Sequence, residues 1–292
     1  MILIGENIHI ISKVVSEAVR NRDAAAIQAL AKQQAEAGAD YLDLNLGPAR
    51  QDPRAVGSWL VDTVQEVTGL PISLDTMNPA AMEAGLALCK ARPILNSASG
   101  KAESKELMMP LAVKFNTQAV VSVITDLGCP PDVDARVESI MDTVAYANGL
   151  GISNRDIFVD PIILPVSADQ KQVREALEFI RILSDLLPDV RSVVGLSNVS
   201  NGTPAHLRGI LNRTYLVMLE KCGLYSAIAD VLDAELVELN KGRFKHIREL
   251  IYRAMEGEQF DTSELPQRER NYVKTARVLM GDSLYSHAWL ES

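Results

Sequence analysis

The sequence predicts an α/β fold, a (β/α)8 TIM barrel with a C-terminal helical extension, from three observations. Eight short apolar runs have the composition of buried β-strands, helical stretches separate them, and the eight units together occupy about 240 residues. Strands that alternate with helices pair in parallel, because each helix carries the chain back to the start of the next strand. Eight such units fit a closed barrel better than a doubly wound sheet.

The eight strand-like runs are rich in Val, Ile and Leu, as expected for strands that are buried on both faces. In chain order they are ILIGENI (2–8), YLDLNLG (41–47), PISLDTM (71–77), PILNSAS (93–99), AVVSVIT (119–125), IFVDPII (157–163), SVVGLSN (192–198) and SAIADV (226–231).

The stretches between these runs carry helix signals. Residues 23–39 are rich in Ala and Gln and stop at Gly38, residues 79–91 open with Pro79, and residues 132–151 follow a Pro-Pro pair and end in glycines. The first strand-like run is not followed by GxGxxG, so a dinucleotide-binding fold is not favoured. We therefore expect residues 1–242 to form the barrel.

Residues 243–292 lie beyond the eighth unit and form the predicted C-terminal extension. Phe244, Ile247, Leu250, Ile251 and Ala254 recur at helical spacing, and residues 269–280 have the composition of a second helix. We expect these helices to pack on the outside of the barrel, or else to make a dimer or partner contact.

The composition excludes several classes of protein. A net charge of −9 without a long basic run argues against a nucleic-acid partner. Three distant cysteines without a CxxC predict neither a disulfide framework nor a zinc cluster. No run of about 18 apolar residues is present, so no membrane span is expected and a cytoplasmic location is the default.

Acids and amides recur where the predicted strands end, which is the side of a barrel that carries the active site. Any one of them could cap the helix that follows. Caps need not lie inside apolar strands, however, and a buried carboxylate without partners is costly. The residues at these ends are Glu6, Asn7, Asp43, Asn45, Asp75, Asn96, Asp160, Asn198 and, less clearly, Asp230.

The residue types that are missing narrow the chemistry. No strand end carries the lysine of a Schiff-base aldolase. The four histidines form no HxH or HExxH, so a metal-dependent hydrolase is poorly supported and no metal site is expected. We interpret His9 and His206 as ordinary loop histidines. Carboxylates and amides suit a flat heterocycle with several N–H donors, such as an aminopyrimidinone, although composition alone does not choose among heterocycles.

The chain resembles the pterin-binding methyltransferases of corrinoid metabolism. The matching stretches are LIGENI, GADYLDLNLGP, PISLDTMNPAAMEAGL, ILNSASG, VDPIILP, GLSNVSNG and LNRTYLVMLEKCGLYSAIAD, which run from residue 2 to about residue 231. The resemblance implies a barrel that binds tetrahydrofolate or 5-methyltetrahydrofolate in its mouth as a substrate. It also implies methyl transfer between N5 of that folate and a corrinoid (cobalamin), free or supplied by a partner corrinoid protein.

The resemblance also implies roles for individual residues. Asp75, Asn96 and Asp160 should hold the pterin, with Asp43 and Asn45 on the same floor of the site. Asn198 should lie near N5 as the catalytic residue, and Arg208 is similar to an arginine of the family. A homodimer is implied as well, formed through outer helices or the extension so that the mouth stays open.

Three other functions remain open from the sequence. Dihydropteroate synthase shares the pterin pocket, but it usually follows its sixth-strand Asp-Pro with a glycine-rich stretch and a lysine, and DPIILPVSADQ has neither. A non-catalytic folate-binding subunit would bind tetrahydrofolate without turnover. An unrelated barrel enzyme, such as a lyase, would bind no pterin.

Overall fold

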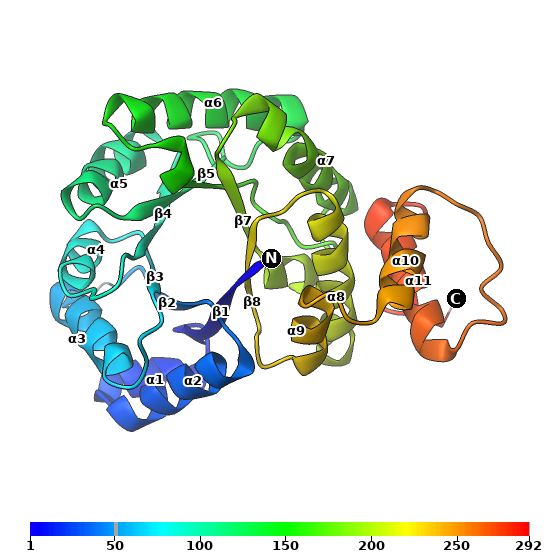
Figure 1. Ribbon diagram of the computed structural model, residues 1–292, viewed down its shortest axis with the longest axis horizontal. Coiled ribbons are helices and arrows are strands. Elements are labelled where there is room, and N and C mark those ends of the chain that lie inside the picture. The colour runs from blue at the N-terminus through cyan, green and yellow to red at the C-terminus, as the bar shows by residue number, and fades with distance from the viewer. Residues whose placement is uncertain (50–51, 292) are drawn as a thin grey trace.

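The computed structural model describes residues 1–49 and 52–291 and contains a closed barrel of eight parallel strands in the order β1 to β8. Figure 1 shows the strands as an inner ring with the helices around it. The predicted fold class is confirmed, and each strand lies within or beside its predicted run. The strands are β1 (Ile2–His9), β2 (Tyr41–Gly47), β3 (Ile72–Thr76), β4 (Ile94–Ser99), β5 (Gln118–Ser122), β6 (Ile157–Asp160), β7 (Arg191–Gly195) and β8 (Ser226–Ala229).

Helices and two short 3-10 turns connect the strands and cover the barrel. The α-helices are α1 (Lys13–Asn21), α2 (Ala24–Ala37), α3 (Pro53–Gln65), α4 (Pro79–Leu86), α5 (Ala102–Lys114), α6 (Val133–Gly149), α7 (Gln170–Leu186), α8 (Ala205–Lys221), α9 (Ala234–Asn240), α10 (Lys245–Met255) and α11 (Gln267–Met280). The 3-10 turns are η1 (Asn154–Asp156) and η2 (Leu196–Ser200). Helix α4 begins at Pro79, as the sequence pattern predicted, and the Asn78 side chain caps it.

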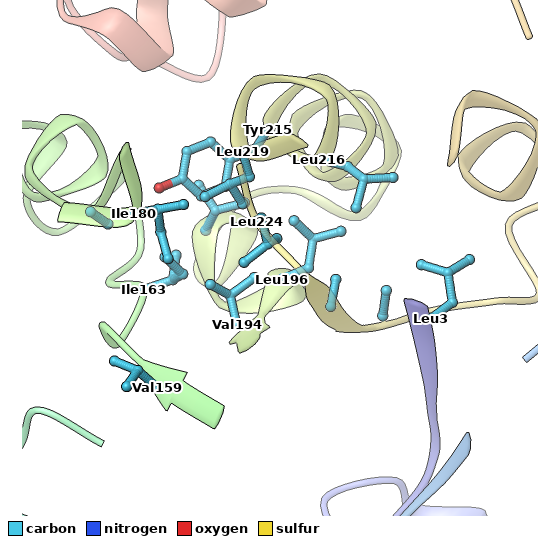
Figure 2. Packing of buried hydrophobic residues seen from close by; sticks show 14 of the residues in the cluster. Leu3, Val159, Ile163, Ile180, Val194, Leu196, Tyr215, Leu216, Leu219 and Leu224 are labelled. Atoms are coloured by element: carbon cyan, nitrogen blue, oxygen red, sulfur yellow. The ribbon is translucent and has the colours of Figure 1, made fainter. Parts of the chain in front are cut away.

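The apolar core has two parts, which explains why the strands are apolar on both faces. A small cluster inside the barrel contains Ile4, Ile94, Val120, Phe158 and Val193. The larger cluster lies between the outer faces of the strands and the helices. Figure 2 shows part of it, with Tyr215, Leu216 and Leu219 of α8 close to Val194 and Leu196. The inner cluster fills the barrel, so it leaves space for a ligand only at an end.

The extension packs beside the barrel at α8 (Figure 1). Ile247, Leu250, Ile251 and Ala254 are buried, as the helical spacing predicted. Phe244 does not follow the prediction, because it precedes α10 as the N-cap residue and is 38% exposed. Arg248 of α10 forms an ion pair with Glu220 of α8 through Nη1 at 2.7 Å. These contacts join the extension to the helix that also borders the carboxyl ends of the strands.

Candidate active site

A polar cavity of about 720 Å³ opens at the carboxyl ends of the strands. All seven residues that the sequence proposed for the site line it: Asp43, Asn45, Asp75, Asn96, Asp160, Asn198 and Arg208. They come from β2, β3, β4, β6, η2 and α8, which are far apart in sequence. The fold therefore brings the proposed residues together, while their roles stay predictions.

The floor of the cavity is a hydrogen-bonded group centred on Asp43. Ser73 donates through Oγ to Asp43 Oδ1 at 2.7 Å, and Asn96 donates through Nδ2 to the same oxygen at 3.2 Å. All three residues are buried. Burial raises the pKa of the Asp43 carboxyl to about 6, although both hydrogen bonds oppose the rise.

Asp75 and Asn45 form a second pair on the neighbouring strands. Asn45 donates through Nδ2 to Asp75 Oδ2, and its own Oδ1 accepts the Gly47 N–H at 3.0 Å, which fixes the orientation of the amide. Burial, together with the nearby charges of Asp43 and Asp160, raises the pKa of Asp75 well above its usual value.

Asp160 ends β6 with its side chain in the cavity. Its Oδ1 accepts the Ile162 N–H at 2.8 Å, and Oδ2 makes no hydrogen bond to any residue that the structure describes. Burial raises the pKa of Asp160 to about 7. A ligand that offers N–H donors would supply the partners that this carboxyl lacks.

Asn198 lies in η2, just beyond β7, and not within a strand as the predicted run suggested. Its Oδ1 accepts from Asn201 Nδ2 at 3.2 Å, which leaves Nδ2 to donate elsewhere. A Cβ atom at Gly195 would lie 3.0 Å from Asn198 Nδ2, so a glycine there gives the amide its room. Arg208 of α8 supports the same segment, since its Nε donates to Ser200 Oγ at 3.1 Å.

Three strand irregularities turn the site residues into the cavity. The pairing of β1 with β2 shifts between Gly5 and Ile8, next to Glu6 and Asn7. Similar shifts occur in β2 between Asn45 and Gly47, and in β4 between Leu95 and Ala98. A bulge breaks the strict alternation of side chains, so consecutive residues such as Glu6 and Asn7 can both line the cavity.

The cavity also contains residues to which the sequence gave no role. Glu6, Asn7 and Asp230 were noticed only as polar strand ends, and Ser197 and Asn212 were not anticipated. Asn7 donates through Nδ2 to Asp230 Oδ1 at 2.8 Å. A helical position such as Asn212 carries no signal in a single sequence.

The interpretation of His9 as a loop histidine was wrong, because His9 ends β1 and lines the cavity. Burial and the charge of Arg208 lower its pKa, so it does not balance the acids around it near neutral pH. Among the described residues that line this cavity, Arg208 is the only Lys or Arg side chain.

The described residues contain no cluster of three or more His, Cys, Asp or Glu side chains that could hold a metal ion. Among the same residues, no helix is long and apolar enough to cross a membrane.

A closed barrel whose mouth is lined by carboxyls and amides is suited to a small, donor-rich polar ligand. The profile of the family "Pterin binding enzyme" matches residues 12–229. The chain belongs to this family.

Several relatives support this placement. The methylcorrinoid:tetrahydrofolate methyltransferase of Eubacterium limosum is 30% identical over 239 residues, which are 81% of this chain and 88% of the relative. The methionine synthase of Mycobacterium tuberculosis is 29% identical over 227 residues, which cover 74% of this chain but only 19% of that enzyme.

Solved structures share the fold. A dihydropteroate synthase of Xanthomonas albilineans aligns with a TM-score of 0.61 at 18% identity, covering 85% of this chain and 92% of that one. The enzyme of Yersinia pestis, bound to a sulfonamide drug, aligns with a TM-score of 0.62 at 15% identity, covering 83% and 94%. At such identities the likeness concerns the fold alone.

Proposed function

We propose that this protein is a methyltransferase that moves a methyl group between a corrinoid and N5 of tetrahydrofolate. The observation that carries the proposal is the convergence of Asp75, Asn96 and Asp160 in one cavity of a pterin-binding barrel. The similarity to the methyltransferase of Eubacterium limosum, which extends over most of both chains, supports the choice of reaction.

In this proposal the floor of the cavity recognises the pterin. The Asp160 carboxylate accepts two N–H donors from the aminopyrimidinone edge, which is a charge-assisted pairing. Asn96 offers one donor and one acceptor to a mixed edge, and Asp75 and Asn45 complete the floor. Arg208 lies beside η2, where the less buried part of the folate would leave the cavity.

The chemical step requires that N5 is held in position and that N5 gains a proton. Cobalt(I) of the corrinoid substrate displaces the methyl group from N5, and the C–N electron pair stays on nitrogen, which then takes up a proton. The protein holds N5 in line with the approaching cobalt. Asn198 contributes a hydrogen bond that strengthens as N5 gains electron density, which lowers the barrier without tighter substrate binding. The reverse reaction uses the same groups.

A dihydropteroate-synthase-like condensation is the second candidate, since the solved structures above share its fold. That reaction requires a pterin pyrophosphate. The described part of the cavity wall offers six acidic residues, Glu6, Asp43, Asp75, Asp160, Asp230 and Asp233, and one arginine, which is unfavourable for a polyanion. This charge balance counts against a pterin pyrophosphate as the substrate.

We also propose that a corrinoid protein delivers the cobalt to the open mouth. For the assembly we propose a homodimer formed through outer helices or residues 243–292, so that the mouth stays accessible. For the location we propose the cytoplasm, on the basis of the sequence. A monomer in light scattering at micromolar concentration would contradict the dimer.

The function is tested by mixing the protein with tetrahydrofolate and methylcobalamin without oxygen and following the cobalamin spectrum. We expect conversion to cob(I)alamin together with formation of 5-methyltetrahydrofolate. Tetrahydrofolate binding without spectral change would indicate a folate-binding subunit, and a lack of any pterin binding would point to an unrelated barrel enzyme. Product from a pterin pyrophosphate and 4-aminobenzoate would support the condensation instead.

A further inference from the structure

Glu6 is a partly buried carboxyl on the side of the cavity where Asn198 lies. It stands at the bulge of β1, and Ser197, the neighbour of Asn198 in the chain, donates through Oγ to Glu6 Oε1 at 2.6 Å. Asn212 of α8 donates through Nδ2 to Ser197 Oγ at 3.2 Å. Because Ser197 accepts from Asn212, its own proton is directed to Glu6.

The other oxygen of Glu6, Oε2, makes no hydrogen bond to any residue in the described ranges, and Glu6 lines the cavity. One oxygen is thus held by the protein, while the other is available to a ligand. Neither Asp43 nor Asp75 offers this arrangement near Asn198, since both belong to the hydrogen-bonded floor.

Burial, a hydrogen bond and the surrounding charges together hold the pKa of Glu6 near neutrality. Burial is the main cause that raises the pKa of Glu6 to about 7, and Asp230 and Asp43 add to the rise. The hydrogen bond from Ser197 and the charge of Arg208 oppose it. His9 has a lowered pKa and adds no positive charge near neutral pH. A carboxyl in this range can both give and take a proton at physiological pH.

Methyl transfer moves one proton in each turnover. N5 of 5-methyltetrahydrofolate carries a methyl group and no hydrogen, whereas N5 of tetrahydrofolate carries one hydrogen. When the C–N bond breaks, the electron pair remains on N5 and a proton must join it. When a methyl group arrives, the same proton must leave.

We propose that Glu6 is a second catalytic residue of this site, which donates its carboxyl proton to N5 as the methyl group leaves and takes it back in the reverse reaction. Ser197 and Asn212 are positioning residues that orient Glu6. The inference rests on the methyl transfer proposed above and adds the identity of its proton carrier.

The test is kcat/KM for methyl transfer from 5-methyltetrahydrofolate to cob(I)alamin between pH 5 and 9. The wild-type profile should be bell-shaped near pH 7, rising as Asp160 ionises to bind the pterin and falling as free Glu6 loses its proton. Glu6→Gln keeps an oxygen that accepts from Ser197 but cannot donate a titrating proton. We expect its rate to fall about 10²–10⁴-fold and the high-pH fall to disappear, with tetrahydrofolate affinity within about tenfold.

Ser197→Ala separates proton transfer from a purely structural role. The hydrogen bond from Ser197 favours the ionised Glu6, so its removal should move the high-pH fall to higher pH. A Glu6→Gln enzyme with the wild-type rate and pH profile, or a Ser197→Ala profile that is lower but unshifted, would overturn the proposal. Failure of the proposed function would look different, because the wild-type protein would then transfer no methyl group at any pH.

Discussion

At the scale of single residues, the carboxyls of the cavity are held where their charge is poorly solvated. Asp160 shows this most plainly: burial raises its pKa to about 7, and the Ile162 N–H lowers it only in part. Its usual value is 3.8, so the folded protein binds this proton more tightly than the unfolded chain does. The contribution of Asp160 to stability is therefore greatest below about pH 4 and is lost as the pH rises towards 7.

Asp160→Asn should consequently stabilise the ligand-free protein while weakening the substrate complex. An amide has no ionisation penalty, so the gain in the free energy of unfolding should grow between pH 4 and 7 and then stay constant. A shift of roughly three pKa units corresponds to about 4 kcal/mol, which is an upper bound because the surroundings relax. Loss of the charge-assisted pairing should weaken tetrahydrofolate binding about ten- to a hundredfold.

Urea unfolding at several pH values and calorimetric titration with tetrahydrofolate check both effects. Asp185→Asn is a suitable control, since Asp185 is exposed on α7 and its carboxyl stays in water. It should change stability by less than about 0.5 kcal/mol at every pH. An Asp160→Asn protein that is no more stable at pH 8 than at pH 4, relative to wild type, would contradict the argument from burial.

At the scale of elements, the strands could be predicted because parallel strands buried on both faces are continuous apolar runs. The polar residues at their ends could be predicted for the same reason, since Asp75 and Asp160 interrupt such runs. The bulges could not be predicted, because they depend on tertiary contacts. The bulge in β1 begins at Gly5, where a Cβ atom would lie 2.4 Å from Gln34 Oε1 of α2. Without the bulge in β1, alternation would point only one of Glu6 and Asn7 inward.

The 3-10 turn η2 could not be predicted from the sequence either, because the apolar run 192–198 placed Asn198 at the end of a strand. Side chains of α8 hold this turn: Arg208 donates to Ser200, and Asn212 donates to Ser197. The same helix therefore orients both proposed catalytic residues. The family resemblance had pointed to Arg208, but nothing in the sequence pattern marked Asn212 as more than a helical position.

Asn198→Ala tests whether η2 presents a catalytic amide or only a capping residue. Removal of one preorganised hydrogen-bond donor commonly costs about 10²–10³ in rate. We expect a loss of this size in single-turnover methyl transfer, with tetrahydrofolate affinity within about tenfold of wild type.

Asn201→Ala is the matched variant, because it removes the hydrogen bond between the two amides while keeping Asn198 itself. It should lower the melting temperature about as much as Asn198→Ala does but retain more of the rate, because the Asn198 amide remains although its contact with Asn201 and the bond from Arg208 to Asn201 are lost. Equal rates in the two variants, or a near-normal rate with a lowered melting temperature in Asn198→Ala, would leave Asn198 with a structural role only.

At the scale of the whole molecule, α8 links the site to the extension. Residues in the first two turns of α8 line the cavity, while Glu220 near its C-terminal end forms an ion pair with Arg248 of α10. On α7, Gln170 donates to the Val278 and Ser283 carbonyls at 2.6 Å each, which anchors the segment after α11. The extension thus braces the α7–α8 side of the barrel and lies beside it (Figure 1).

The loops at the mouth carry unusually exposed apolar side chains. Leu127 is 100% exposed in the turn after β5, Ile11 is 87% exposed after β1, and Met77 is 74% exposed after β3. Such residues are ordinary when scattered singly, but these three lie on segments that leave the same end of the barrel. If a corrinoid protein presents its cobalt to the cavity, as proposed above, it must cover these loops and would bury these side chains.

The double substitution Leu127→Ser with Met77→Ser should therefore separate the two kinds of methyl donor. With a methylated corrinoid protein, we expect KM to rise at least about tenfold, because buried apolar anchors contribute much of the affinity of an interface. With free methylcobalamin, which needs no protein contact, the rate should stay within about twofold of wild type. Val113→Ser is the control, since Val113 is 48% exposed near the C-terminal end of α5, which lies at the end of the barrel opposite the mouth. A rise in KM that is equal for the mouth variant and for Val113→Ser would show that the partner does not recognise the loops after β3 and β5.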